Sequence, residues 1–140
     1  MKTNARAFSL DTNVIVRFLT RDDEALYQKA QRIMRDITEG QITVVLDPVA
    51  LAETVWVLGS FYKRSKTEIG TALSAIIKSD NVLLPKKSRY ILALDMFGKT
   101  NAHFGDACAC AAALEDCEGR IFSFDRELSK IEGIERREMV

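Results

Sequence analysis

FSLDTNVIVRFL, residues 8–19, is the stretch that best predicts the fold of this chain. Its first apolar residues stop at Asp11, and Thr12 and Asn13 then supply side chains that favour the start of a helix before a further apolar stretch. This order predicts a buried strand that passes directly into a helix, with a carboxylate at the carboxyl end of the strand. In open parallel sheets, ligands and metals bind at that end.

The same order of residues returns near the end of the chain. IFSFD, residues 121–125, is a second short apolar run that ends in an aspartate, Asp125. Because the carboxyl ends of parallel strands lie at one edge of a sheet, we expect Asp11 and Asp125 to meet in space.

Strands and helices are expected to alternate along the rest of the chain. The apolar runs predict strands at residues 7–10, 42–46, 81–84 and 120–124, and an edge strand at 134–139. Helical periodicity and capping residues predict helices at residues 13–19, 23–39, 47–61, 65–77, 88–98, 103–117 and 126–131. The strands are apolar throughout, which is typical of a parallel sheet covered by helices on both faces. We therefore predict an α/β fold, a three-layer α/β/α sandwich with a mainly parallel central sheet.

The composition favours one domain spanning residues 1–140. Hydrophobic residues make up 47% of the chain, and with only 2 prolines and 7 glycines no linker is visible. The formal net charge of zero argues against a protein that coats nucleic acid, although it leaves a nuclease possible in principle. Residues 1–6 lack the apolar region of a signal peptide, and no apolar run approaches the ~18 residues of a membrane span. We therefore expect a cytoplasmic protein without a membrane segment, whose three cysteines are small packed side chains.

Two further acids stand out by their helical neighbours. The residues three and four positions away from Glu53 are all apolar, and those around Asp106 are mostly apolar. This pattern predicts that both carboxylates project from the inner sides of their helices. A buried carboxylate is costly unless it has a partner, which is a cation, a set of hydrogen-bond donors or a metal.

Together, these observations select Asp11, Glu53, Asp106 and Asp125 as candidate metal ligands. Four neighbouring anions need a counter-charge, and ligation by oxygen alone favours Mg²⁺ or Mn²⁺ over zinc. Each acid taken alone has an ordinary alternative. In these alternatives, Glu53 would pair with a buried Arg or Lys, and Asp106 would complement a helix dipole. Asp125 would cap a helix, and Asp11 would belong to a turn.

In these motifs the chain resembles PIN-domain ribonucleases, and in particular VapC-type toxins of bacterial or archaeal toxin–antitoxin pairs. The resemblance covers residues 8–139 and rests on four segments in the order and spacing of the family: LDTNVI at 10–15, AET at 52–54, HFGDA at 103–107 and FSFDREL at 122–128.

The resemblance implies roles for particular residues. It implies that Asp11, Glu53, Asp106 and Asp125 are the catalytic quartet that binds Mg²⁺ or Mn²⁺. It also implies that short polar side chains beside the quartet support it by hydrogen bonds, namely those of Thr12, Asn13 and Ser123. Relatives of this size commonly form homodimers and bind a small antitoxin that blocks the acidic pocket. From the residues themselves, Arg17 and Arg21 are candidate substrate guides, because they follow Asp11 closely.

The function predicted from this sequence is that of a metal-dependent endoribonuclease that cleaves phosphodiester bonds in RNA. Two biological roles stay open, the toxin of a type II toxin–antitoxin pair and a PIN nuclease of RNA processing. Two other classes compete with a nuclease. An aspartyl-phosphate phosphatase-like protein is disfavoured because Thr12 and Asn13 follow Asp11 where a second acid is usual. A non-catalytic binding module is disfavoured because unneeded buried acids cost stability.

Overall fold

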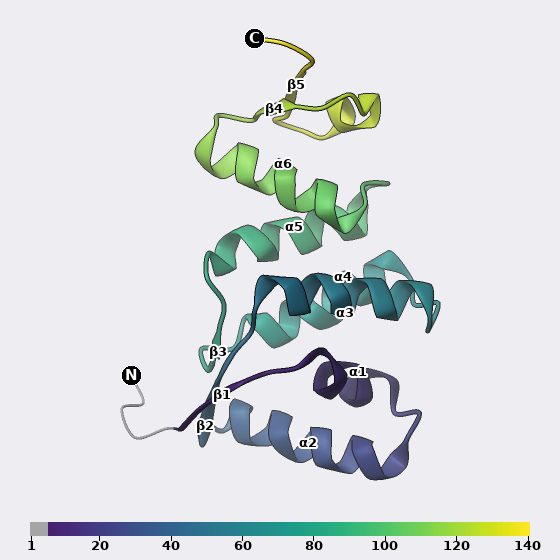
Figure 1. Cartoon of the computed structure of the whole chain (residues 1–140), viewed down its shortest axis with the longest axis vertical. Helices are drawn as coiled ribbons and strands as arrows, with labels where there is room; N and C mark the ends of the chain where they lie inside the picture. Colours follow the sequence, from purple (N-terminus) through teal and green to yellow (C-terminus); the bar gives the residue numbers. More distant parts are fainter. Residues whose placement is uncertain (1–5) are drawn as a thin grey trace.

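The structure is a computed structural model that describes residues 6–140, so the expectation about a signal peptide concerns residues that lie almost wholly outside it. Helices and strands alternate along the described chain (Figure 1). In order they are β1 (Arg6–Ser9), α1 (Thr12–Thr20), α2 (Glu24–Thr38), β2 (Ile42–Val45), α3 (Pro48–Ser60), α4 (Lys66–Ile77), β3 (Val82–Leu83), α5 (Lys87–Lys99), α6 (Phe104–Asp116), β4 (Arg120–Phe122), the 3-10 helix η1 (Arg126–Lys130) and β5 (Glu135–Arg137). Within residues 6–140 no helix has the length and apolar character to cross a bilayer.

Polar side chains at the helix starts explain where α3 and α4 begin. Asp47 accepts a hydrogen bond from the backbone amide of Val49 (2.7 Å), and Pro48 occupies the first turn of α3. Ser65 and Glu68 form a capping box, in which the Glu68 amide donates to Ser65 Oγ (3.1 Å) and the Ser65 amide donates to Glu68 Oε1 (3.0 Å). Both predicted helix starts are confirmed.

The strands are parallel, as predicted, and the α/β/α class is confirmed, but the described strands form two sheets. The first sheet has the order β1-β2-β3, with Phe8 opposite Val44 and Val44 opposite Val82. The second contains β4 and β5, with Ile121 opposite Arg136. Among residues 6–140, β4 does not pair with β1, so each of these two strands keeps one edge free.

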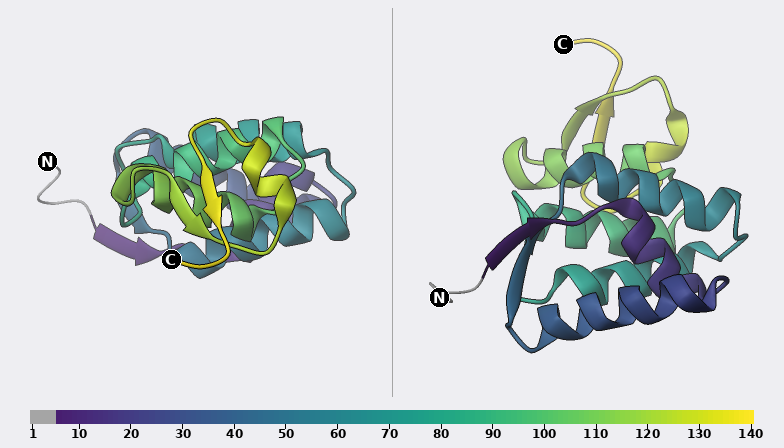
Figure 2. Two further views of the ribbon diagram at one scale, coloured as in Figure 1. Left: turned by 90° about the horizontal axis from the view of Figure 1, so that it is seen from above. Right: turned by 60° about the horizontal axis from the view of Figure 1, so that its bottom comes forward.

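Helices separate the two sheets. α3, α4, α5 and α6 lie between the three-stranded sheet and the β4–β5 pair, as two views of the ribbon agree (Figures 1 and 2). α4 packs so closely on α5 that a Cβ added at Gly70 would lie 2.9 Å from the backbone oxygen of Leu94. The rings of Phe97 and Phe104 pack edge to face, with 5.9 Å between their centroids, and join α5 to α6. One continuous cluster of buried side chains therefore links the sheets through this helical stack.

One face of the three-stranded sheet is open at its centre. Ser9, Val45 and Leu83 are neighbours across the strands and therefore share a face. All three are exposed, whereas Val44 and Val82, on the opposite face, are buried. At these positions the described helices cover one face of the sheet and leave the other uncovered.

Candidate functional site

Asp11 and Glu53 form the first acidic group, and Thr12 lies between them. Asp11 follows β1 and is the N-cap of α1, where its Oδ2 accepts a hydrogen bond from the Asn13 amide (3.4 Å). Thr12 is buried, and its hydroxyl lies 2.8 Å from Glu53 Oε1 on α3 and 3.2 Å from the carbonyl oxygen of Ala50. The hydroxyl has one proton to donate, so these two oxygens share it. The backbone of Asn13 and the side chain of Thr12 thus orient the two acids.

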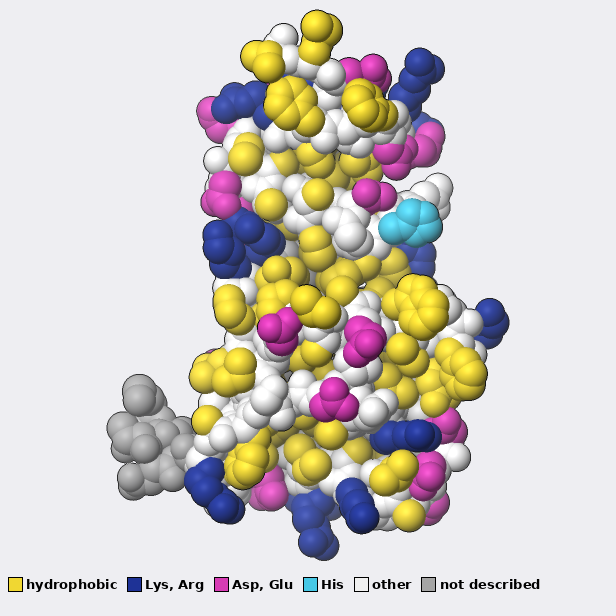
Figure 3. All heavy atoms as spheres, viewed as in Figure 1, with side chains coloured by type: hydrophobic (Ala, Val, Ile, Leu, Met, Phe, Trp, Pro, Cys, Tyr) yellow, Lys and Arg dark blue, Asp and Glu magenta, His cyan; other side chains and the backbone are white. Residues whose placement is uncertain are grey.

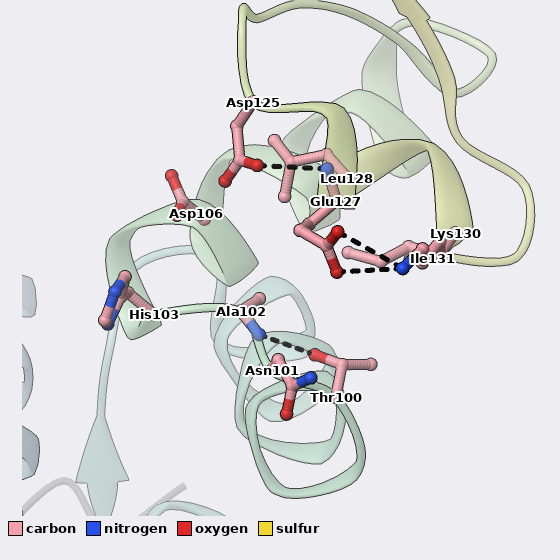
Figure 4. Close-up of a pocket in the computed structure, with 10 residues that line it drawn as sticks. All are labelled: Thr100, Asn101, Ala102, His103, Asp106, Asp125, Glu127, Leu128, Lys130 and Ile131. Carbon is pink, nitrogen blue, oxygen red and sulfur yellow. Dashed lines mark hydrogen bonds and ion pairs between the residues drawn. The ribbon is translucent and has the colours of Figure 1, made fainter.

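Asp106 and Asp125 form the second acidic group. Both line a pocket of about 370 Å³ between the start of α6 and η1. The Asp125 carboxylate points toward the first turn of α6, where Asp106 lies (Figure 4). His103 from the segment before α6 and Glu127 from η1 line the same pocket, so titratable side chains besides the two candidate aspartates lie at this site.

Backbone hydrogen bonds hold Asp125 in place. Its amide donates to Ser123 Oγ (3.0 Å), and its Oδ1 accepts from the Glu127 amide (3.0 Å), which makes Asp125 the N-cap of η1. Arg136 on β5 donates to the carbonyl oxygen of Ser123 (2.8 Å). This turn ends β4 at Phe122, two residues earlier than predicted. Arg136 was not identified from the sequence, because its contact depends on the pairing of β5 with β4.

None of the four candidate ligands has a cationic partner within residues 6–140. Other acids do: Asp22 pairs with Arg17 (3.0 Å), and Glu115 pairs with Arg89 (2.9 Å). The ion pairs of the described chain include neither Asp11, Glu53, Asp106 nor Asp125. The alternative in which Glu53 pairs with a buried Arg or Lys is therefore not realised among these residues.

The predicted inward position of Glu53 is wrong. Glu53 is exposed, and its helical neighbours Val49 and Trp56 are 76% and 67% exposed. α3 instead buries the side that carries Leu51 and Leu58. This helix is apolar on nearly every side, so its sequence could not indicate which side faces the core.

The structure does not bring the four acids into one pocket. Within residues 6–140, no group of three or more His, Cys, Asp and Glu side chains is placed to hold a metal ion. Acidic side chains instead lie apart from one another among hydrophobic ones on the face shown in Figure 3. The expected meeting of Asp11 and Asp125 fails because β1 and β4 belong to different sheets, with the helical stack between them.

The two candidate substrate guides are held by neighbouring acids. Arg17 bonds Asp22 at 3.0 Å, and Arg21 bonds Glu24 at 3.1 Å while it stacks over the ring of Tyr27 at 4.2 Å. A role for Arg17 or Arg21 in binding RNA stays a prediction. It requires that an RNA phosphate replace the neighbouring carboxylate as the partner of the arginine, or bind the arginine together with it.

Cys108 and Cys110 pack against other side chains as expected, whereas the expectation is wrong for Cys117. Burial raises the pKa of the Cys108 thiol to about 11, so this thiol stays protonated at neutral pH. Cys110 is fully buried in α6, and Cys117 is exposed at the end of that helix. No disulfide or thiolate chemistry follows from this arrangement.

A parallel α/β fold with carboxylates that follow its strands is typical of proteins that act on ligands at the carboxyl ends of a sheet. Comparison with known families identifies this one: residues 9–134 match the PIN domain, and the chain belongs to the PIN domain family. None of the curated proteins matches the chain. PIN domains are generally nucleases, a class of hydrolases, and typically use divalent metal ions.

Proposed function

We propose that this PIN domain is a metal-dependent endoribonuclease, in which Asp11, Glu53, Asp106 and Asp125 bind Mg²⁺ or Mn²⁺ and the substrate is RNA. The observation that carries the proposal is that all four carboxylates lack a cationic partner in the described chain. Carboxylates left without Lys or Arg partners suit hard cations, which prefer oxygen ligands.

The chain's own residues prepare these ligands. Thr12 orients Glu53, and the amides of Asn13 and Glu127 fix one carboxylate oxygen each of Asp11 and Asp125. Such contacts set the direction in which a ligand's free oxygens point. A divalent ion bound by these carboxylates, at either acidic group, would polarise a phosphate and lower the pKa of a bound water.

We further propose that the protein is the toxin of a VapC-type toxin–antitoxin pair, that it acts as a homodimer in the cytoplasm and that a small antitoxin covers its acids. The support is the resemblance of the four sequence motifs to VapC-type toxins. A gene for a small DNA-binding antitoxin directly upstream is the expected genomic arrangement. An upstream region without one would favour a role in RNA processing instead.

Removal of divalent metals is expected to lower RNA cleavage by about 1,000-fold or more, because a metal supplies several kcal/mol of transition-state stabilisation. The measurement is cleavage of a labelled RNA in Mg²⁺ or Mn²⁺, after EDTA, and after metal is restored. Single-stranded DNA of the same sequence is the control for substrate class. Undiminished cleavage in EDTA would refute the metal-dependent mechanism.

Thr12→Val is expected to lower kcat/KM by roughly 10- to 100-fold, because it keeps the shape of the side chain and removes the donor that orients Glu53. Thr12→Ser is the matched control, since it keeps the hydroxyl. Both variants are compared with the wild type in the same cleavage assay. Equal activity in the two variants would show that the hydroxyl does not support the site.

A further inference from the structure

β1 and β4 each have a free edge in the described chain. β1 pairs only with β2, and β4 pairs only with β5, among residues 6–140. The Leu10 amide donates to the Val45 oxygen (2.9 Å), and because amides alternate along a strand, those of Ala7 and Ser9 point to the free edge of β1. A strand edge with unpaired amides is a template for another strand.

The other two outer edges are protected, whereas these two are not. β3 is only two residues long, and β5 consists of three charged residues, Glu135, Arg136 and Arg137. Short length and charge are the means by which proteins prevent edge pairing. β1 and β4 carry a charge only at their first residue and then continue as Ala-Phe-Ser and Ile-Phe. The composition of β1 and β4 is therefore that of strands with a neighbouring strand on each side.

Aromatic side chains at these edges expose a large apolar surface. Phe8, Phe122 and Phe124 are 45%, 67% and 82% exposed. At roughly 200 Å² for each complete phenylalanine, they present about 400 Å² in one copy and about 800 Å² in two. The open sheet face at Val45 and Leu83 and the strand backbones add to this area, which brings it toward the roughly 1,200 Å² of a stable interface. Figure 3 shows hydrophobic side chains gathered at the end of the molecule that carries β4 and β5.

Contacts within the chain keep the two free edges apart. Leu128 of η1 is 2% exposed in the buried cluster, and Arg89 on α5 bonds Glu115 on α6. Pairing of β4 with β1 of the same chain would pull such contacts apart, because α3 to α6 lie between the strands. A second copy meets no such obstacle.

We propose that two copies of this chain exchange strands, so that β4 of each copy pairs in parallel with β1 of the other. The pairing would join the two sheets into a continuous sheet that runs β3-β2-β1 in one copy and β4-β5 in the second. Its carboxyl edge would carry Asp11 and Glu53 from one copy beside Asp106 and Asp125 from the other, and would reunite the two acidic groups. The sharing of acids rests on the proposed function, whereas the exchange itself does not.

Mixed dimers test the shared site. Asp11→Asn and Asp125→Asn are each expected to be inactive, but unfolding and refolding them together should restore about a quarter of wild-type cleavage, because half of the dimers then contain one intact site of two. A mixture of Asp11→Asn with Glu53→Gln is the matched control, since both changes lie in the same half of the site, and it should stay inactive. Active wild-type dimers without recovery in the first mixture would overturn the shared site.

The mass of the full chain in solution tests the exchange without any activity. Wild type and Ala7→Val should have twice the 15.7 kDa mass of one chain by light scattering, whereas Ala7→Pro should be monomeric, because it removes a free-edge amide and leaves the β1–β2 ladder intact. A folded Ala7→Pro dimer, or a monomeric wild type, would overturn the proposal even if the protein cleaved no RNA. If Ala7→Pro fails to fold, the mass of the wild type and the activity of the mixed dimers test the strand exchange instead.

Discussion

Replacing Asp106 by Asn is expected to lower kcat/KM for RNA cleavage by about 1,000-fold or more, since the amide keeps the size of the side chain and loses the charge that binds a metal. Asp106 lines the same pocket as Asp125 and has no cationic partner in the described chain. Its charge lies in the first turn of α6, so its loss from the helix dipole should cost about 1 kcal/mol of stability at most. The variant should therefore fold normally, but it should bind metal poorly.

Asp23→Asn is the matched control for this change. Asp23 is the N-cap of α2 and accepts from the Leu26 amide (3.0 Å), a role that Asn fills equally well. Cleavage and Mn²⁺ binding by titration calorimetry should match the wild type for this variant and fall for Asp106→Asn and Asp11→Asn. Wild-type activity in both of the latter variants would remove the nuclease assignment to these acids.

Gly119→Ala is expected to lower the free energy of unfolding by about 3 kcal/mol or more, because two penalties combine. Gly119 has a φ of +83°, which side-chain-bearing residues rarely adopt. An added Cβ would also lie 1.9 Å from the backbone oxygen of Gly133, a contact that only movement of the backbone relieves. That movement would disturb the turn before β4 and the hydrogen bond from the Glu135 amide to the Gly119 carbonyl oxygen (2.8 Å), beside the β4–β5 pairing.

Gly105→Ala is the control with the opposite expectation. Nothing lies within 4 Å of a Cβ at this position in the first turn of α6, so Ala should leave stability unchanged or raise it by roughly 0.5–1 kcal/mol through its helix propensity. Urea unfolding followed by circular dichroism measures both variants. Equal stability of the two variants would mean that the turn between α6 and β4 adapts to a side chain at little cost.

Local chemistry explains what was predictable in the fold. The capping box of Ser65 and Glu68 and the Asp47-Pro48 pair depend only on neighbours in the sequence, and both begin helices as expected. Apolar strands between amphipathic helices likewise predicted the α/β class and the parallel pairing, which the structure and the PIN domain match confirm. The positions of Asp11 and Asp125 after strands follow from the same local pattern.

Longer-range features were not predictable for physical reasons. The inward position expected for Glu53 failed because α3 is apolar on almost all sides, so periodicity leaves its orientation undetermined. The contribution of Arg136 depends on β5 pairing with β4, which is a contact between segments that no short window of sequence encodes.

Strand ends, caps and periodicity are local properties of the chain, so they were enough to predict the element order, the parallel α/β class and four candidate acids, Asp11, Glu53, Asp106 and Asp125. How those acids group depends on tertiary packing. It places Glu53 with Asp11 through Thr12 and Asp106 with Asp125 around one pocket, and it leaves β1 and β4 unpaired. Which strand edges meet depends on the packing of the helices between them, and that packing is a property of the whole buried core.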